Sequence, residues 1–346
     1  MRFCVLEWIC GGGMHPFSPK EISASLRQEG WQMLQCLCQQ FHHAGHVVST
    51  VVDQRLLNRQ QMAEIANGAH LITGFQSQAL TKGNSLLPLS ALDLTLSAWH
   101  LVAQKCDQTI VVAPELDGIL EYCINHLRKL DVPMLNCTGQ FLANSCDKWL
   151  TAQCLHQHRI PHPLTWTVDD FIEADLDLAD RWCVKPRWGA GCEGLRIFDA
   201  KLAPAVLSEL RTPSNYIIQP WTPGRAYSCS AVVNRAGNIT WLPLVTQEFS
   251  ASYSSERFEG LCYSGARIAP PKLQQLRPTK LLNQALMALA SADSREMQGW
   301  IGVDLVVDAC GCWNVIEINP RLTTSAVELC SLGYVQLAEQ MLVESL

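Results

Sequence analysis

The segments Gly302-Val303-Asp304-Leu305-Val306 and Val315-Ile316-Glu317-Ile318-Asn319-Pro320-Arg321 decide how this chain folds and what it binds. Each is apolar and rich in β-branched residues, which favours a β-strand. A turn sequence, Ala309-Cys310-Gly311-Cys312, lies between them. We therefore predict a hairpin in which the two strands are neighbours in one sheet.

The polar side chains of this hairpin form a candidate metal site. Glu317 and Asn319 are two residues apart and so share a face of the strand, and Asp304 lies across from them. Two carboxylates and an amide oxygen suit Mg²⁺ or Mn²⁺, with nucleotide phosphates as further ligands. Glu317 stands between isoleucines, where an unpaired charge is costly, and Arg321 is placed to meet an anion. The competing interpretation is ordinary acidic residues at strand ends and an Asn-Pro turn.

Composition excludes several classes of protein. Of 346 residues, 48% are hydrophobic and 17% are charged, which is typical of a globular chain with more than one domain. The formal net charge of −6 argues against a nucleic-acid surface, and no apolar run reaches the length of a membrane span. Glu7 interrupts the apolar N-terminal segment, so we interpret that segment as a strand and not as a signal peptide. We expect a cytoplasmic protein with no nucleic-acid or membrane partner.

The sixteen cysteines do not form a recognisable framework. They are scattered, and no Cys-x-x-Cys pair occurs, so neither zinc-ribbon spacing nor a thioredoxin-like motif is present. Several fall in apolar stretches, where they are expected to be small buried hydrophobes in a reducing compartment; these are Cys4, Cys123, Cys183 and Cys229. For a further group we favour a structural role over a metal site: Cys154, His156, His158 and His162.

The N-terminal part alternates strands and helices, which predicts an α/β fold with a doubly wound parallel sheet. Ligands in such sheets bind at the carboxyl ends of the strands. Strands are expected at 2–9, 47–52, 70–74 and 109–112, and helices at 25–44 and 90–105. The predicted strand ends carry Glu7, Gly11-Gly12-Gly13, Thr73-Gly74 and Glu115. The triple glycine is not Gly-x-Gly-x-x-Gly, so it supports no dinucleotide site; a flexible turn and a substrate loop remain equally open.

The pattern changes to α+β beyond residue 136. We predict two domains, 1–136 and 137–346, with 160–218 as a small mobile lid. Helices are expected at 147–158 and 278–292, and short strands at 182–185, 195–198, 216–219, 227–234 and 239–244. The last two strands of the chain are those of the metal hairpin.

A glycine-rich segment follows the strand that ends in Lys185. Gly189, Gly191 and Gly194 lie within six residues, and such a loop exposes backbone N–H groups that hold phosphate oxygens. It is not a Walker A loop, because a strand and not a helix follows. We predict a hairpin that folds over an anion beside Lys185, against the alternative of a plain hairpin turn. Further on, the strand end at Gln219 and the nearby Trp221 suit a flat base.

In this order, these elements resemble the ATP-grasp superfamily over roughly 136–335, with the alternating domain before it in the expected place. Any one motif is weak, but the ordered set is specific. The matching stretches are Asp147-Lys148, Ile160-Pro161-His162-Pro163, Val184-Lys185-Pro186 with its glycine loop, Ile218-Gln219, Gly224, Tyr227-Ser228, Cys262-Tyr263-Ser264-Gly265, Pro270, Asp304 and Glu317-Ile318-Asn319-Pro320-Arg321.

The resemblance implies a role for each matching position. Lys148 and Lys185, with the three loop glycines, would hold ATP phosphates, and Gln219 and Trp221 would lie by the adenine. Asp304, Glu317 and Asn319 would bind two Mg²⁺ or Mn²⁺ ions, and Arg321 would act in catalysis on the acyl phosphate or the substrate carboxylate. One departure concerns the hinge, where relatives usually carry acids and this chain has Pro220, Pro223, Arg225 and Ala226. Either the usual ribose contact is absent or another residue provides it.

The N-terminal half narrows the resemblance to the tyramine–L-glutamate ligase branch, whose members serve methanofuran biosynthesis. The resemblance rests on Leu6-Glu7-Trp8 with the triple glycine, 25–34, Ala44-Gly45-His46-Val47 and 53–56. It implies a carboxylate–amine ligase that joins L-glutamate to an aromatic amine through an acyl phosphate. Substrate contacts are assigned to Glu7, Gly12 and Arg267, and a homodimer is compatible with the sequence. The alternatives are another ATP-grasp ligase, a carboxylase or kinase with a different acceptor, and a nucleotide-binding module without turnover.

Overall fold

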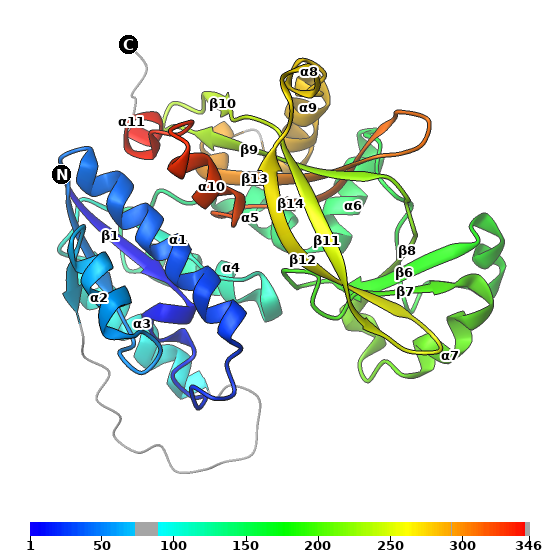
Figure 1. Ribbon diagram of the computed structural model, residues 1–346, viewed down its shortest axis with the longest axis horizontal. Coiled ribbons are helices and arrows are strands. Elements are labelled where there is room, and N and C mark those ends of the chain that lie inside the picture. The colour runs from blue at the N-terminus through cyan, green and yellow to red at the C-terminus, as the bar shows by residue number, and fades with distance from the viewer. Residues whose placement is uncertain (73–88, 292, 343–346) are drawn as a thin grey trace.

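The computed structural model describes residues 1–72, 89–291 and 293–342. Two sheets organise these residues (Figure 1): a parallel sheet near the N-terminus and a long antiparallel sheet formed by the rest of the chain. The predicted α/β class with its parallel N-terminal sheet is confirmed. No helix among the described residues combines the length and the apolar composition that crossing a membrane takes.

The first sheet has the strand order β3-β2-β1-β4, and its described pairs are all parallel. Side chains alternate across β1, so Phe3 and Val5 enter one core while Cys4 and Leu6 enter another on the opposite face. Helix α1 covers the first face and α3 and α4 cover the second. The bounds are β1 Arg2–Glu7, β2 Val47–Val51, β3 His70–Ile72, β4 Gln108–Val112, α1 Ala24–His43, α2 Arg59–Ala66, α3 Leu89–Ala103 and α4 Ile119–Lys129.

Local sequence explains where these elements begin and end. The Ser23 side chain accepts a hydrogen bond from the Leu26 backbone N–H at 3.1 Å, which satisfies a free donor at the start of α1. Gly45 follows the end of α1 with φ +81°, a conformation that glycine adopts without strain. Buried side chains on the covered face, such as Leu34 and Phe41, each contribute about 1.5–3 kcal/mol.

The second sheet contains ten strands within the described residues, in the order β14-β13-β9-β11-β12-β7-β6-β8-β5, with β10 paired to β9. Their bounds are β5 Trp166–Thr167, β6 Arg181–Pro186, β7 Arg196–Asp199, β8 Tyr216–Pro220, β9 Arg225–Val233, β10 Ile239–Trp241, β11 Val245–Ser254, β12 Glu259–Ile268, β13 Gly299–Val307 and β14 Trp313–Asn319. Its helices are α5 Gly139–Cys146, α6 Lys148–Gln157, α7 Ala203–Ser208, α8 Pro271–Gln275, α9 Thr279–Leu289, α10 Ser325–Ser331 and α11 Leu337–Leu342.

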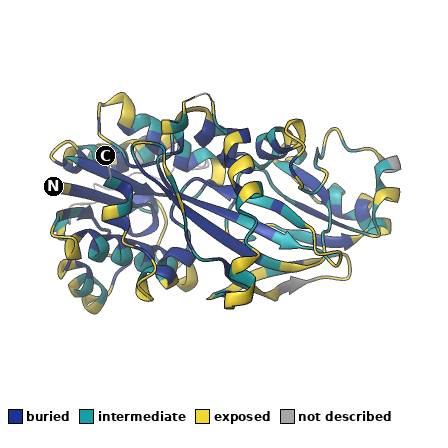
Figure 2. Ribbon diagram, turned by 90° about the horizontal axis from the view of Figure 1, so that it is seen from above, coloured by how far each residue is buried: buried dark blue, intermediate teal, exposed yellow. Residues whose placement is uncertain are grey.

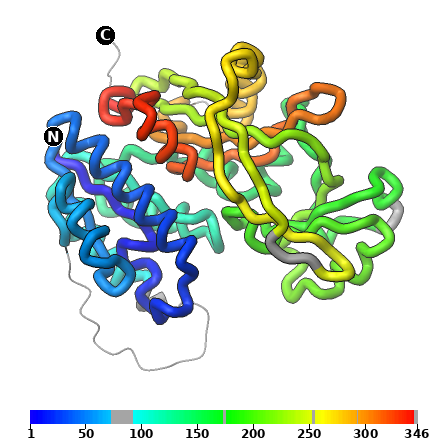
Figure 3. Tube along the Cα trace, viewed as in Figure 1, coloured from blue at the N-terminus to red at the C-terminus, as the bar shows by residue number. Residues whose placement is uncertain are grey.

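One end of the long sheet forms a separate lobe, which we call the lid (residues 166–220, β5 to β8). It has its own small core around Trp182, Phe198 and Ile218. The remainder of the long sheet with its helices is called the body. The lid joins the sheet of the body where β12 meets β7, at the single pair Glu259–Ile197. Figure 3 shows the chain entering and leaving the lid through short connections. The mobility of this lobe and the domain boundaries stay predictions.

The last two helices return to the N-terminal part. Leu329 of α10 and Met341 of α11 share a core with Leu34 and Phe41 of α1. Helix α11 consequently lies on the same side of the molecule as the start of β1 (Figure 1). Figure 2 shows that buried residues follow the strands of both sheets while exposed residues lie mostly on helices and loops.

Several predicted elements differ from those in the structure. The strand predicted at 2–9 ends at Glu7, because the chain then makes a tight turn over Ile9–Gly13. The strand predicted at 239–244 ends at Trp241, shortly before Pro243, which lacks the N–H that a ladder needs. The long β11–β12 hairpin was not predicted. The predicted strand end at Thr73-Gly74 lies outside the described residues.

Candidate functional site

The predicted hairpin of β13 and β14 is present, and it brings the candidate metal ligands together. Asp304 pairs directly with Glu317 across the two strands. The Asn319 side chain donates from Nδ2 to Asp304 Oδ2 at 3.1 Å, and Gln247 of β11 donates from Nε2 to Asp304 Oδ1 at 3.0 Å. The three oxygen-bearing side chains named from the sequence are therefore neighbours on one surface of the sheet.

Burial and mutual repulsion shape the charge of the two carboxylates. Desolvation, followed by the negative charge of Glu317, raises the pKa of Asp304 to about 6. Desolvation also opposes ionisation of Glu317, but the positive charges of Lys148 and Lys185 outweigh it and lower the pKa of Glu317. The arrangement holds one firmly ionised carboxylate beside another that ionises less readily.

The two lysines link this carboxylate pair to the lid. Lys148 begins α6, and its Nζ lies 2.9 Å from Glu317 Oε1 and donates to the backbone oxygen of Gly189 at 2.6 Å. Its side chain is 9% exposed, so little water competes for these contacts. Burial lowers the pKa of Lys185, and the charge of Glu317 partly offsets that effect. Both cations thus converge on the place where the sequence predicts phosphates.

The glycine-rich segment connects β6 to β7 as the predicted hairpin. Gly191 and Gly194 have φ +67° and +72°, which side chains other than glycine rarely adopt. A Cβ on Gly194 would also lie only 3.0 Å from Cγ of Pro186. Backbone without side chains therefore lines this loop next to Lys185, as an anion-binding loop requires.

The other ATP candidates lie at the base of the lid. Gln219 is buried at the end of β8, and its Nε2 donates to Thr165 Oγ1 at 2.8 Å. Trp221 follows β8, and its backbone N–H donates to the Arg181 oxygen at 2.9 Å. These contacts fix the hinge segment, whereas adenine recognition by Gln219 and Trp221 stays a prediction.

Arg321 forms an ion pair that joins the two parts of the molecule. Its Nη2 donates to Glu115 Oε2 at 2.8 Å, and its Nη1 donates to the Leu322 oxygen at 3.1 Å. Glu115 follows β4 of the first sheet, 206 residues away in sequence. Within the described residues, Nε of Arg321 and Oε1 of Glu115 are buried without a hydrogen-bond partner. The guanidinium therefore has an unused donor.

The chemistry of the donor set fits a divalent cation. Asp304 and Glu317 are half-buried, opposed and both anionic when ionised, so a cation between them would relieve their repulsion. Carboxylate and amide oxygens are the ligands that Mg²⁺ prefers. The described residues contain no cluster of three or more Asp, Glu, His and Cys side chains that could complete the shell. Phosphate oxygens or water would have to supply the remaining ligands.

The three residues assigned to substrate lie in different surroundings. Glu7 is 1% exposed, and its carboxylate accepts from the backbone N–H groups of Ile9 at 3.0 Å and Cys10 at 2.6 Å. Gly12, in the same turn, offers its carbonyl oxygen to the Thr95 hydroxyl at 3.0 Å. The Arg267 side chain is 77% exposed and pairs with a carboxylate on β11. Glu7 holds the glycine turn in shape, and substrate contacts by all three stay predictions.

Glu7 should make stability depend on pH. Desolvation, partly offset by its backbone hydrogen bonds, raises its pKa from 4.5 to about 7. The folded protein therefore holds this proton more tightly than the unfolded chain, and the free energy of unfolding falls as pH rises from about 4.5 to about 7, by roughly 3 kcal/mol from this group. We expect Glu7→Gln to flatten that dependence in urea titrations at about pH 5.5 and pH 8. Exposed Glu259→Gln should change nothing; parallel pH curves for wild type and Glu7→Gln would contradict the interpretation.

Several residues of the site were not assigned a role from the sequence. Glu115 was noted only as a strand end, and Gln247 lies on an unpredicted strand. Arg187 donates from Nε to Asp147 Oδ1 at 3.2 Å and so ties the glycine loop to the start of α6. The Gly-rich context of Arg187 was the only local signal available. The other contacts join segments that are far apart in the chain, so the spacing of residues in the sequence does not predict them.

Comparison with known families assigns two stretches of the chain. Residues 145–325 match the family described as ATP-grasp domain, and residues 75–140 match the pre ATP-grasp 3 domain. The tyramine–L-glutamate ligase of Methanocaldococcus fervens is 23% identical over 223 residues, 64% of this chain and 61% of that protein. The D-alanine–D-alanine ligase of Alcanivorax borkumensis is 25% identical over 207 residues, 59% of this chain and 62% of that protein. The matches thus span about three fifths of the length of these curated relatives.

Solved structures show the same architecture. The D-alanine–D-alanine ligase of Bacillus anthracis complexed with ATP superposes with a TM-score of 0.59 at 16% identity, covering 99% of this chain and 95% of that one. An L-amino acid ligase of Bacillus licheniformis gives a TM-score of 0.61 at 15% identity, covering 98% of this chain and 73% of that one. At these identities the likeness concerns the fold alone.

Proposed function

Because the chain belongs to the ATP-grasp family, we propose that it is an ATP-dependent ligase that joins a carboxylate to an amine. The observation that carries the proposal is the opposed pair Asp304 and Glu317, tied by Lys148 to the glycine loop of the lid. The relatives named above as ligases support it. ATP is the nucleotide substrate in this proposal, and two divalent ions, Mg²⁺ or Mn²⁺, accompany it.

The residues of the site would divide the work between binding and positioning. The metal site would consist of Asp304, Glu317 and Asn319. The Mg²⁺ or Mn²⁺ that they hold would neutralise the negative charge of the phosphates. Lys148, Lys185 and the backbone of the glycine loop would hold the phosphates. Closure of the lid would exclude water, which otherwise consumes an activated acyl group.

The reaction needs no nucleophilic side chain. An oxygen of the substrate carboxylate attacks the γ-phosphorus of ATP, and the bond to the bridging oxygen breaks to release ADP. The amine nitrogen then attacks the acyl carbon of the acyl phosphate, phosphate leaves, and the nitrogen loses a proton. Arg321, which sits 2.8 Å from Glu115 with a free Nε, would bind the carboxylate or its phosphate and keep it in line.

L-Glutamate and an aromatic amine such as tyramine are the substrates we propose, in a step of methanofuran-type cofactor biosynthesis. The support is the similarity to a tyramine–L-glutamate ligase at 23% identity. Relatives named for D-alanine show that the same fold serves other acids and amines. Hinge residues Pro220 and Arg225 replace the acids expected there, so ribose must be held elsewhere.

An assay of ADP release decides this proposal. Purified protein with ATP, Mg²⁺, L-glutamate and tyramine should release ADP and phosphate and yield a product whose mass is the sum of the two substrate masses less one water. Omission of either substrate is the control. If this pair fails but another acid and amine from a panel succeed, the substrate proposal is wrong and the ligase class stands. No ADP above background with the whole panel would contradict the ligase class.

A second candidate is a nucleotide-binding module without turnover. The altered hinge acids favour it, because they leave the ribose without its usual partner. It predicts ATP binding by calorimetry with no hydrolysis under any acceptor, and a Glu317→Gln variant that retains function in the cell. Another ATP-grasp chemistry, such as phosphorylation or carboxylation, is separated from ligation by the identity of the product.

A further inference from the structure

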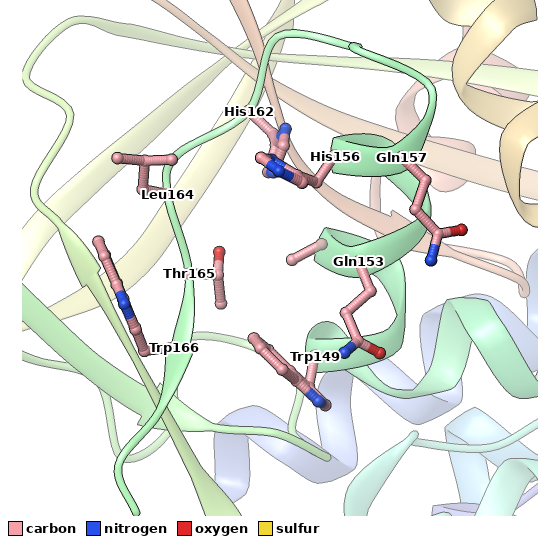
Figure 4. A pocket seen from close by; sticks show the side chains of 9 residues that line it. Trp149, Gln153, His156, Gln157, His162, Leu164, Thr165 and Trp166 are labelled. Atoms are coloured by element: carbon pink, nitrogen blue, oxygen red, sulfur yellow. The ribbon is translucent and has the colours of Figure 1, made fainter. Parts of the chain in front are cut away.

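A cleft of about 370 Å³ lies at the joint between body and lid, and its lining includes neither of the paired carboxylates. We call it the hinge cleft. One wall is a face of α6, and the opposite wall is the segment 162–165 with the start of β5 (Figure 4). The volume is within the range of small-molecule sites, and such sites occur preferentially where domains meet. The side chains that face it most clearly are Trp149, Gln153, His156, His162, Thr165 and Trp166.

The lining is aromatic and amide in character and carries no formal charge. Two indoles, two imidazoles and two carboxamides contribute, and none of the lining residues is Lys, Arg, Asp or Glu. In the part of the chain that the structure describes, the carboxamides of Gln153 and Gln157 have no hydrogen-bond partner. Trp166 is held in place by Phe171 and Trp182, whose ring centroids lie 5.8 and 5.7 Å away. The cleft therefore presents one fixed ring face and free hydrogen-bonding groups.

His162 adds a directed acceptor. Its Nδ1 lies 2.7 Å from the Ile160 carbonyl oxygen, and since a carbonyl only accepts, Nδ1 carries the proton of the neutral ring. Burial lowers the pKa of His162 and outweighs the hydrogen bond to Ile160, which raises it. The ring is accordingly neutral at neutral pH, with Nε2 as a free acceptor. This acceptor favours a ligand with an N–H donor.

We propose that the hinge cleft is a second ligand site, separate from the nucleotide site, for an uncharged planar nitrogen heterocycle. A flat ring matches the indole faces of Trp149 and Trp166. A ring N–H matches His162, and the carboxamides satisfy either a donor or an acceptor on the ring edge. Charged ligands are disfavoured, since the lining offers no counter-ion.

Occupancy of the cleft would act on the lid. Thr165 accepts a hydrogen bond from Gln219 at 2.8 Å, and Trp166 pairs with Ile218 of β8. On the other wall, α6 begins with Lys148, which bonds to the glycine loop. A ligand that contacts both walls would fix the lid relative to the body and change the apparent affinity for ATP. Binding itself does not depend on the ligase activity proposed above.

The test uses benzimidazole as the probe, with the full chain and an excess of a non-hydrolysable ATP analogue and Mg²⁺ to fill the nucleotide site. Saturation-transfer NMR should show binding with a Kd on the order of 1 mM, as expected for so small a ligand. Cyclohexylmethanol, similar in size but not aromatic, should not bind. Gln153→Leu, at an exposed position, and Trp149→Ala should each weaken benzimidazole at least tenfold. Leu178→Ala, which truncates an exposed lid leucine outside the cleft, should leave it unchanged.

Four results would overturn the proposal. Saturation transfer that is seen without the ATP analogue but lost in its presence would assign the binding to the nucleotide site. Equal binding of cyclohexylmethanol would show an apolar crevice without selectivity. Unchanged affinity in both cleft variants, with circular dichroism spectra matching wild type, would place the probe elsewhere; no saturation transfer at millimolar probe would remove the site altogether. Each result is independent of whether ADP is released with any acid and amine.

Discussion

Glu317→Gln should lower ATP-dependent ADP release by a factor on the order of 10² to 10³. The substitution keeps the size of the side chain and removes the negative charge that pairs with Lys148 at 2.9 Å. Lys148 and Lys185 hold that charge in place, since they lower the pKa of Glu317. It also leaves Asp304 as the one acidic metal ligand of the hairpin. Initial rates of ADP formation at several Mg²⁺ concentrations measure the effect, and the loss should be partly recovered at high Mg²⁺.

The matched control is Glu259→Gln, which changes the same side chain on an exposed part of β12. Glu259 pairs with Arg181 at the surface, and its side chain is 59% exposed, so turnover and thermal midpoint should stay near wild type. If Glu317→Gln retained full turnover while folding normally, Glu317 would have no part in holding the metal or phosphates. The non-catalytic alternative would then gain support.

Arg321→Lys should reduce kcat by roughly 10- to 100-fold and raise the KM for the carboxylate substrate. Lysine keeps one positive charge that Glu115 can hold, but it lacks the planar fork and the free Nε that would meet a carboxylate or phosphate. Steady-state kinetics with the carboxylate varied at saturating ATP measures both constants. The KM for ATP should change much less, because the lysines and glycine loop hold the nucleotide.

Two companion variants separate charge from position. Arg295→Lys alters an arginine whose side chain is 76% exposed and pairs with Asp293, so it should leave kcat and both KM values unchanged. Glu115→Gln keeps a hydrogen-bond acceptor for Arg321 and should give a smaller loss, confined to kcat and the carboxylate KM. A larger rise in the KM for ATP than for the carboxylate in Arg321→Lys would assign the guanidinium to the nucleotide and contradict the proposed role.

Local sequence patterns predicted the elements that are strongly apolar or are bounded by clear turn and cap residues. The hairpin of β13 and β14 and the strands β2 and β4 follow from β-branched runs, and α1 follows from its spacing and from Gly45. The β11–β12 hairpin was missed because its residues are polar and half exposed. Such strands are stabilised by pairing with neighbours more than by burial of one face.

The site was predicted where one segment supplies several of its groups and missed where distant segments meet. Asp304, Glu317 and Asn319 belong to one hairpin, so their proximity follows from strand geometry. The pairing of Arg321 with Glu115 spans 206 residues and depends on how two sheets pack. Neither partner carries a local signal of the other, and a single sequence holds no record of that contact.

The packing of α10 and α11 against α1 has a consequence for synthesis. A ribosome delivers the N-terminal residues first, yet the core on the α1 face of the first sheet is completed by Leu329 and Met341. During translation that face of the first sheet stays partly uncovered until almost all of the described chain has emerged. The N-terminal part is therefore not expected to fold completely before the rest of the chain is made. Truncation before α10 should expose an apolar surface that chaperones bind.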